Sequence, residues 1–313
     1  MYDLSIVIPS RSEMFLAKTI EDILHKKRGR TQVIATLDGA WADPQIKDHK
    51  DVVLIHYTEP VGQRGAMNSA VKLSDAKYIA KCDAHCGFDE GFDVKLLADM
   101  RDNWTMVPVM RNLHAFDWVC ENGHRRYQGS SANCAICGAK EHREYVWKGK
   151  TNPQSDSYCF DSQPHFQYFK EYRQRPEYKK MKEETGLTET MSLQGSFFLT
   201  TREKYWELGL CDEGFGSWGT QGIEVAVKTW LSGGKCMVSH KTWYGHMFRT
   251  QGGDFSFPYP LKARQQNDAK AYGRDLFFNN KYNKAIHPLS WLVERFWPVP
   301  GWSEEELNKI KGK

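Results

Sequence analysis

Short apolar runs recur along the first third of the chain, separated by segments with helical periodicity. A continuous apolar run without polar alternation is typical of a strand buried on both faces. Four such strands are predicted, in LSIVIPS (4–10), TQVIATLDGA (31–40), VVLIHYTEP (52–60) and AKYIAKCDAH (76–85).

Helices are predicted between these runs. Ser10 and Glu13 form a capping-box pattern, after which apolar residues recur at helical spacing through 16–24. A second helix is predicted in VGQRGAMNSAVKLS (61–74). Strands that alternate with helices predict an α/β fold with a parallel sheet, whose ligands bind beyond the carboxyl ends of the strands.

The remaining chain divides by composition. Residues 111–187 are polar, rich in aromatics and poor in glycine, which predicts an insertion into a first segment, 1–110. The core pattern returns in 188–260, and 261–313 reads as a helical C-terminal extension.

Composition bounds the class of protein. The chain has 313 residues, 40% of them hydrophobic and 26% charged, and its net charge of +4 permits an anionic partner without requiring one. No apolar stretch approaches the length of a membrane span, and the start MYDLSIVIPSRSE runs straight into a strand-like segment. Eight cysteines are too sparse for a disulfide scaffold, so we expect a cytoplasmic protein in a reducing compartment.

Acidic and imidazole side chains follow the fourth strand. Asp83 and His85 lie two positions apart, so at a strand end both can face one divalent ion. A solvated strand end with a capping aspartate is the alternative. His246, in TWYGHMFR, is a third candidate ligand, whereas His240 and His287 qualify by composition alone.

A second group of metal-binding residue types lies in the insertion. Its ligands Cys120, His124, Cys134 and Cys137 have the spacing of a closed structural zinc site. Scattered free thiols are the alternative, and Cys159 or His142 would be the replacement for one ligand. Because the insertion has few aliphatic residues, a zinc ion would substitute for a core of its own.

Six lysines and arginines lie between residues 170 and 182 in a segment that reads as helical. Interleaved glutamates favour a solvated face. The functional alternative is an acceptor-recognition surface for an anionic polymer.

Two segments carry a family resemblance. SLQGSFFLTTREKYWELGLCDEGFGSWGTQGIEVAVKTWLSGGK and WYGHMFRTQGGDFSFPY resemble the polypeptide N-acetylgalactosaminyltransferases, and LSIVIPSRSEMFLAKTIEDIL with LDGAWAD resembles the wider GT-A glycosyltransferases. The likeness covers 3–110 and 188–260 and leaves out the insertion. It implies a GT-A fold, with 1–110 as the nucleotide-sugar half and 188–260 as the acceptor and catalytic half.

The resemblance also implies roles for individual residues. Asp83, His85 and His246 would hold Mn²⁺ against the diphosphate of a UDP-sugar donor. Residues matching the donor site are Pro9, Ser10 and Glu13 under the nucleotide, Asp38 at the uracil, Arg64 near the donor, Gln194 and Gly195 at the sugar, and Trp218 and Arg249 at the diphosphate.

One position departs from the family pattern. Gln221 stands where the family has an acidic residue, and an amide cannot act as a general base. We therefore expect transfer with retention of configuration. Glu224, the next carboxylate, is the alternative base for an inverting reaction, or else a buried helix-terminal acid.

The function predicted from these features is Mn²⁺-dependent transfer of a hexose or N-acetylhexosamine from a UDP-sugar to a hydroxyl. The favoured acceptor is a hydroxymethylated base in DNA, as for some bacteriophage enzymes, in a bacterial or phage-infected cell. A protein, peptide or glycan acceptor is the alternative, as is a non-catalytic protein that binds glycan or nucleic acid. Gly252 and Gly253, followed by Phe255, Phe257 and Tyr259, predict a lid over the site.

Overall fold

The computed structural model describes residues 1–249, 255–259 and 263–312. Its strands are β1 (Leu4–Ser10), β2 (Thr31–Asp38), β3 (Val52–Tyr57), β4 (Tyr78–Cys82), β5 (Cys86–Phe88), β6 (Trp104–Cys120), β7 (Arg125–Tyr127), β8 (Glu141–Ser155), β9 (Tyr158–Phe160), β10 (Phe166–Tyr168), β11 (Leu187–Glu189), β12 (Phe197–Thr201) and β13 (Lys235–His246). Its α-helices are α1 (Leu16–Lys26), α2 (Gly62–Leu73), α3 (Phe92–Leu97), α4 (Pro176–Thr185), α5 (Arg202–Glu207), α6 (Gln221–Leu231), α7 (Ala263–Phe278), α8 (Leu289–Arg295) and α9 (Glu304–Lys311).

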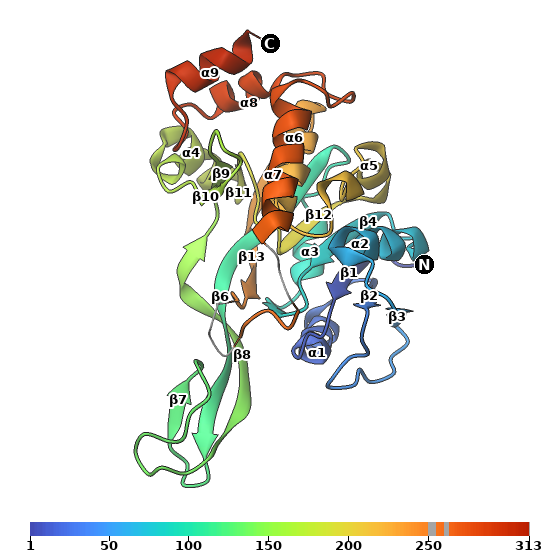
Figure 1. Cartoon of the computed structure of the whole chain (residues 1–313), viewed down its shortest axis with the longest axis vertical. Helices are drawn as coiled ribbons and strands as arrows, with labels where there is room; N and C mark the ends of the chain where they lie inside the picture. The colour runs from blue at the N-terminus through green and yellow to red at the C-terminus, as the bar shows by residue number, and fades with distance from the viewer. Residues whose placement is uncertain (250–254, 260–262, 313) are drawn as a thin grey trace.

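One large sheet organises the molecule, in the order β11-β13-β6-β12-β4-β1-β2-β3 (Figure 1). The four predicted N-terminal strands are confirmed, and β1 pairs in parallel with both β2 and β4. Beyond β4 the sheet is mixed, because β12 runs antiparallel to both β4 and β6. The expected parallel sheet therefore holds for the N-terminal half and not for the whole.

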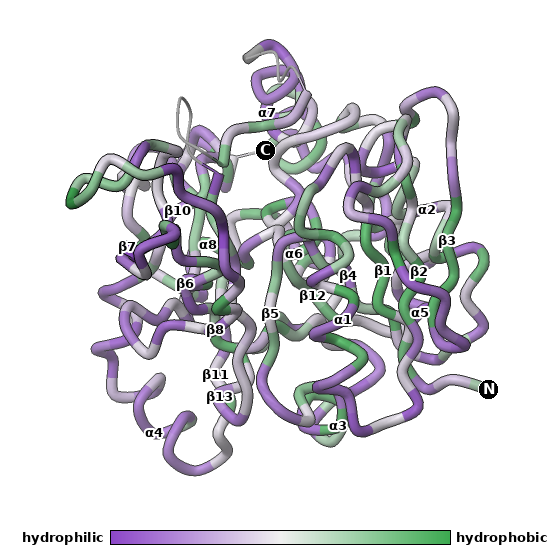
Figure 2. The backbone as a smooth tube through the Cα atoms, turned by 90° about the horizontal axis from the view of Figure 1, so that it is seen from below, coloured by the Kyte–Doolittle hydropathy of each residue, from purple (hydrophilic) through white to green (hydrophobic). Residues whose placement is uncertain are grey.

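Successive residues of β1 face opposite layers of helices, as the alternation of a strand requires. Ile6 and Ile8 pack with residues of α1 and α3, whereas Val7 packs in the larger core with α2, α6, α8 and α9. Both faces of the strand are therefore buried. In Figure 2 the strands β1, β2 and β4 are mainly coloured as hydrophobic, whereas α4, at the edge of the molecule, is mainly coloured as hydrophilic.

The predicted capping box before α1 is wrong. Phe15 is the N-cap residue of α1 and no side chain caps the helix. Glu13 instead accepts a hydrogen bond from Phe15 N with one carboxylate oxygen and contacts His85 and Arg249 with the other. Glu13 therefore contacts distant residues of the site and does not cap the helix.

The first part of the insertion is an extension of the sheet. The predicted boundaries at 110 and 187 fall inside β6 and β11, so these strands continue from the body into the insertion. The outer part of β6 pairs with β7 and β8 to form an arm that projects from the body (Figure 1). At its base Leu113, Phe116 and Trp118 pack against Phe15 and Phe255.

The second part of the insertion returns to the body. Tyr158, Phe160 and Phe169 belong to the main hydrophobic core, and Cys159 is fully buried among them. The insertion therefore has no separate core here, because its aromatic residues complete the core of the body.

The basic segment 170–182 is not one helix. A short 3-10 turn ends at Gln174 and α4 begins at Pro176. Arg175, between them, donates hydrogen bonds to the carbonyl oxygens of Phe296, Trp297 and Pro298. Proline is favoured in the first turn of a helix, which explains the break.

No helix in the described residues is long and apolar enough to cross a membrane.

Candidate metal and nucleotide site

Strand pairing brings the three predicted metal ligands together. Asp83 and His85 lie in the turn between β4 and β5, and β5 pairs with the end of β13 so that Cys86 is opposite His246. The backbone N–H of Met247 donates to the carbonyl oxygen of His85. Residues 163 positions apart in the sequence are thus held side by side.

The ligand atoms of these residues converge. His246 Nε2 lies 3.2 Å and His85 Nε2 lies 3.9 Å from Asp83 Oδ2. All three ligand atoms lie within 4.8 Å of one another. Two imidazole nitrogens and a carboxylate oxygen are a suitable donor set for a divalent transition metal. By contrast, His240 bonds Thr188 and His287 stacks on Trp291, so neither joins this group.

A second carboxylate orients one of the imidazoles. Glu13 Oε2 lies 3.0 Å from His85 Nδ1, which leaves Nε2 directed toward Asp83. The same oxygen contacts Arg249. Burial acts to raise the pKa of Glu13, but His85 and Arg249 outweigh it and lower that pKa. A carboxylate behind a histidine is the usual support of a metal ligand.

Lys81 is a site residue that sequence reasoning missed. Its ammonium is buried, contacts Asp83 and donates to the carbonyl oxygen of Gly195 at 2.5 Å. Burial acts to raise the pKa of Asp83, but Lys81 and His246 outweigh it and hold that pKa far below its usual range. A lysine inside the apolar run YIAKC was the available sign, because an interior lysine needs a partner.

His246 differs from His85, whose second ring nitrogen contacts Glu13. Burial lowers the pKa of His246 to about 4, so its ring is neutral at pH 7 and can offer a lone pair to a metal. Its Nδ1 is buried and has no hydrogen-bond partner among the described residues.

A cavity of about 600 Å³ opens over this group. It is lined by most of the residues predicted for the donor and the metal, namely Pro9, Ser10, Glu13, Asp38, Asp83, His85, Gln194, Gly195, Trp218, Gln221, His246 and Arg249. This volume is in the range of small-molecule sites. Most of the predicted residues therefore line one cavity that is large enough for a ligand.

Two of the predicted residues have internal contacts in addition to facing the cavity. Asp38 accepts hydrogen bonds from the backbone N–H groups of Val61 at 2.6 Å and Gly62 at 3.1 Å. Each carboxylate oxygen keeps a further lone pair for a ligand. Gln194 Oε1 accepts from Ser196 N at 2.6 Å, which fixes the loop that carries Gly195.

Arg64 and Glu224 do not line the cavity, contrary to the sequence-based roles. Arg64 is 1% exposed and donates to Glu224 Oε2 at 2.8 and 3.0 Å. It also donates to the carbonyl oxygens of Gly216 and Gly219, on either side of Trp218. Arg64 therefore positions the Trp218 loop and cannot contact a donor directly.

Glu224 is fully enclosed. Its other oxygen accepts from Asp212 N at 2.7 Å and from Lys228 at 3.0 Å, so both oxygens are engaged by internal partners. A carboxylate in this position is a buried helix acid and cannot reach an acceptor as a base. Of the two roles considered for Glu224, the side-chain geometry therefore favours a buried helix-terminal acid over a base for an inverting reaction.

Gln221 begins α6 at the wall of the cavity. Its Nε2 donates to Cys211 Sγ at 3.1 Å, and its Oε1 is buried with no partner in the described parts of the chain. Next to it, a Cβ on Gly222 would lie 2.0 Å from the carbonyl oxygen of Leu193. Only glycine allows the first turn of α6 to approach the Gln194 loop this closely.

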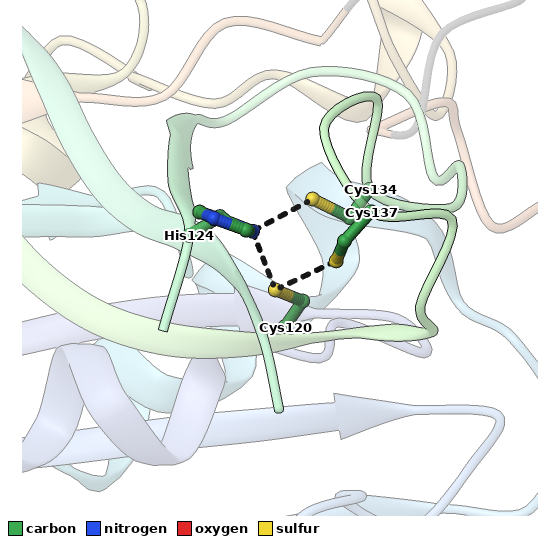
Figure 3. Close-up of side chains that lie close together, drawn as sticks. All are labelled: Cys120, His124, Cys134 and Cys137. Atoms are coloured by element: carbon green, nitrogen blue, oxygen red, sulfur yellow. Dashed lines mark hydrogen bonds between the residues drawn. The ribbon is translucent and has the colours of Figure 1, made fainter. Parts of the chain in front are cut away.

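Four residues of the arm form a separate group, shown in Figure 3. His124 Nδ1 lies 3.5 Å from Cys120 Sγ and 3.6 Å from Cys134 Sγ, and Cys120 Sγ lies 3.7 Å from Cys137 Sγ. Neither Cys159 nor His142, the residues considered as a replacement for one of these ligands, belongs to the group. Cys159 lies in the hydrophobic core, and the side chain of His142 is 62% exposed.

Part of the predicted lid can be placed. Phe255 packs against Phe15 and against the edge of His85, and Phe257 contacts Trp218. Gly252 and Gly253, on which the lid prediction depends, lie outside the described residues.

The mixed sheet with helices packed on both faces has the arrangement of a GT-A fold. A crystal structure of GalNAc-T7 with UDP, GalNAc and Mn²⁺ has the same fold, with a TM-score of 0.61 and 18% identity over 99% of this chain and 54% of that chain. The family model for glycosyl transferase family 2 matches residues 5–209, and the chain belongs to this family.

Curated relatives confirm the resemblance to N-acetylgalactosaminyltransferases. Human polypeptide N-acetylgalactosaminyltransferase 3 is 23% identical over 278 residues, covering 85% of this chain and 40% of the relative. Human N-acetylgalactosaminyltransferase 7 is 31% identical over 100 residues, covering 32% of this chain and 15% of the relative. The chain spans less than half the length of these relatives.

The contact between Glu13 and His85 predicts a graded effect on metal affinity. Glu13→Gln should weaken Mn²⁺ binding about 10- to 100-fold, because a neutral amide oxygen accepts the His85 Nδ1–H bond more weakly than a carboxylate and makes the imidazole a poorer ligand. Isothermal titration with Mn²⁺ measures this, with Glu21→Gln on the exposed face of α1 as the matched control. An unchanged Kd would show that Glu13 does not support the ligand.

Proposed function

We propose that this protein transfers a sugar from a UDP-sugar to a hydroxyl acceptor, with Mn²⁺ held by Asp83, His85 and His246. The observation that carries the proposal is the convergence of these three ligands at the floor of a cavity lined by the predicted donor-site residues. The similarity to a transferase whose crystal structure contains UDP and Mn²⁺ supports this choice of donor and metal.

The residues present fit such a metal. The histidine nitrogens and the Asp83 oxygen form one group, Glu13 supports His85, and His246 is neutral at pH 7. When bound, the cation would offset the negative charge that develops on the leaving diphosphate. Arg249, which also lines the cavity, would add a fixed positive charge at the same place.

The transfer reaction needs no protein base, because the leaving phosphate can take the acceptor proton. The bond between the anomeric carbon and the β-phosphate oxygen breaks, a bond from the acceptor oxygen to that carbon forms, and the hydroxyl proton passes to the departing phosphate oxygen. Asp38 would accept a hydrogen bond from the uracil, and Trp218 would cover the diphosphate. Gln194, Gly195 and Gln221 would contact the sugar.

Removing any ligand of the metal should abolish transfer. Asp83→Ala, His85→Ala and His246→Ala each delete one donor atom from the group, so we expect no detectable product while thermal unfolding stays cooperative. His287→Ala, a histidine outside the group, should retain full activity. Undiminished wild-type activity after exhaustive chelation would refute the metal assignment.

Retention of configuration is proposed for the reaction. Gln221 cannot accept a proton from the acceptor, and Glu224 is enclosed by Arg64 and Lys228. The anomeric coupling constant of the product, measured by NMR, should match that of the donor sugar. An inverted linkage would mean that another group in the cavity acts as base.

A structural zinc ion is proposed for the arm. With Zn–S bonds of about 2.3 Å and Zn–N bonds of about 2.0 Å, a tetrahedral site separates two sulfurs by about 3.8 Å and a sulfur from a nitrogen by about 3.5 Å. The separations of 3.5, 3.6 and 3.7 Å within the group fit this geometry. The contact with Asn122 lowers the pKa of Cys137 to about 6, which favours the thiolate that binds zinc.

The zinc proposal has a direct test in metal content. Purified protein should contain one zinc ion per chain, and Cys134→Ser should lose it and expose the arm to proteolysis before the body. His142→Ala, an exposed neighbour outside the group, should keep its zinc. Wild-type protein free of zinc by elemental analysis would end this assignment.

The basic segment 170–182 gives little support to DNA as the acceptor. Arg173 pairs with Asp156, and Arg175 donates to three carbonyl oxygens near the C-terminus. Lys182 lies 3.7 Å from Asp156 and Lys180 lies 3.9 Å from Glu184. Because internal partners take up much of this charge, the segment is better explained as a structural face than as a polyanion-binding surface.

A further inference from the structure

The loop between β9 and β10 places a histidine at the wall of the cavity. His165 lines the cavity, and its Nδ1 lies 3.0 Å from Asp161 Oδ2. If Nδ1 carries the proton for that bond, Nε2 has a free lone pair and can accept a hydrogen bond from a hydroxyl. The side chain is 51% exposed, so a ligand can reach it.

The loop is held rigidly. Asp161 Oδ1 accepts from the backbone N–H groups of both Gln163 and His165 at 2.9 Å. Arg274 of α7 donates to the carbonyl oxygen of Ser162 at 2.7 Å, and Ser162 N donates to the carbonyl oxygen of Gly301. Asp161 therefore orients His165, and the C-terminal extension holds the loop that carries both residues.

The cavity that His165 lines also contains a lysine. Lys270 of α7 lines the same cavity and also borders a small apolar space with Pro164 and Thr220, so it stands between the loop and the start of α6. Among the described residues Lys270 has no ion-pair partner. Of the other cations that line the cavity, Lys81 pairs with Asp83, Arg249 pairs with Glu13, and Arg11 lies over the ring of Tyr259.

We propose that His165 and Lys270 form the acceptor subsite and select an acceptor sugar that carries a negative charge. His165 Nε2 accepts a hydrogen bond from a hydroxyl next to the one that reacts, and Lys270 pairs with a carboxylate or phosphate on the same acceptor. The inference rests on the proposed transfer reaction and specifies its acceptor. Neither residue takes the reacting proton, which still leaves with the diphosphate.

The test compares a neutral acceptor sugar with two anionic sugars that differ from it at C6. Methyl glucoside, methyl glucuronide and methyl glucoside 6-phosphate are offered to the full chain with Mn²⁺ and UDP-sugars, beside a serine peptide and a hydroxymethylated DNA oligonucleotide. An anionic sugar should be used with a KM at least about 10-fold below that of methyl glucoside. Preference for the glucuronide identifies a carboxylate and preference for the 6-phosphate a phosphate. Equal use of the neutral sugar, or better use of the peptide or DNA, overturns the proposal.

Variants then assign the two side chains. Lys270→Met should raise the KM for the preferred anionic acceptor about 10-fold and leave that for the neutral one unchanged, and Lys270→Arg should restore most of the difference. His165→Ala should raise the acceptor KM about 10-fold for both, with little change in kcat. His114→Ala is the matched control, because His114 pairs with Asp117 on the arm, away from the cavity.

Donor hydrolysis without acceptor separates this inference from the function on which it rests. Wild-type protein that neither hydrolyses nor transfers from any UDP-sugar contradicts the proposed function. Protein that transfers normally, with His165 and Lys270 variants indistinguishable from wild type, contradicts the acceptor subsite alone.

Discussion

The pairing of β5 with the end of β13 is the constraint on which the site depends. It sets His246 opposite Cys86 and so brings it beside His85, while the end of β4 carries Asp83 into the same space. Residues of all three strands belong to the hydrophobic core. The turn that carries Asp83 and His85 is therefore held between two anchored strands, and the candidate ligands are supported by rigid elements.

Charge balance would link the proposed metal to the proposed nucleotide. The carboxylates of Asp83, which is partly buried, and Glu13, which is buried, are matched by Lys81 and Arg249, so these four groups are formally neutral together. A divalent cation added to this group brings excess positive charge into a largely buried place, which is costly unless an anion accompanies it. A diphosphate supplies that anion, so metal and nucleotide should bind as a unit.

The local sequence pattern was sufficient to predict the first four strands and part of the candidate site. The apolar runs predicted β1 to β4, and the spacing of Asp83 and His85 predicted a shared face. The convergence of the four arm residues was predicted from Cys and His spacing, because a closed metal site would constrain short segments of chain. In each case residues close in sequence carried the information.

Predictions failed where a distant residue decides the outcome. Glu13 has the spacing of a capping box, yet His85 and Arg249, from distant segments of the chain, bind its carboxylate. Arg64 was assigned to the donor, but its partner Glu224 lies 160 positions away and draws it behind the cavity. His165 and Lys270 belong to segments without family resemblance, and only the fold brings them to the same wall.

Joint binding of metal and nucleotide is the central claim, and titration of UDP in the presence and absence of Mn²⁺ tests it most directly. Linkage requires that each ligand strengthen the binding of the other by the same factor. The account predicts that UDP binds at least about 10-fold more tightly with Mn²⁺ and that His246→Ala removes this difference. Equal UDP affinity with and without Mn²⁺ in the wild-type protein would contradict it.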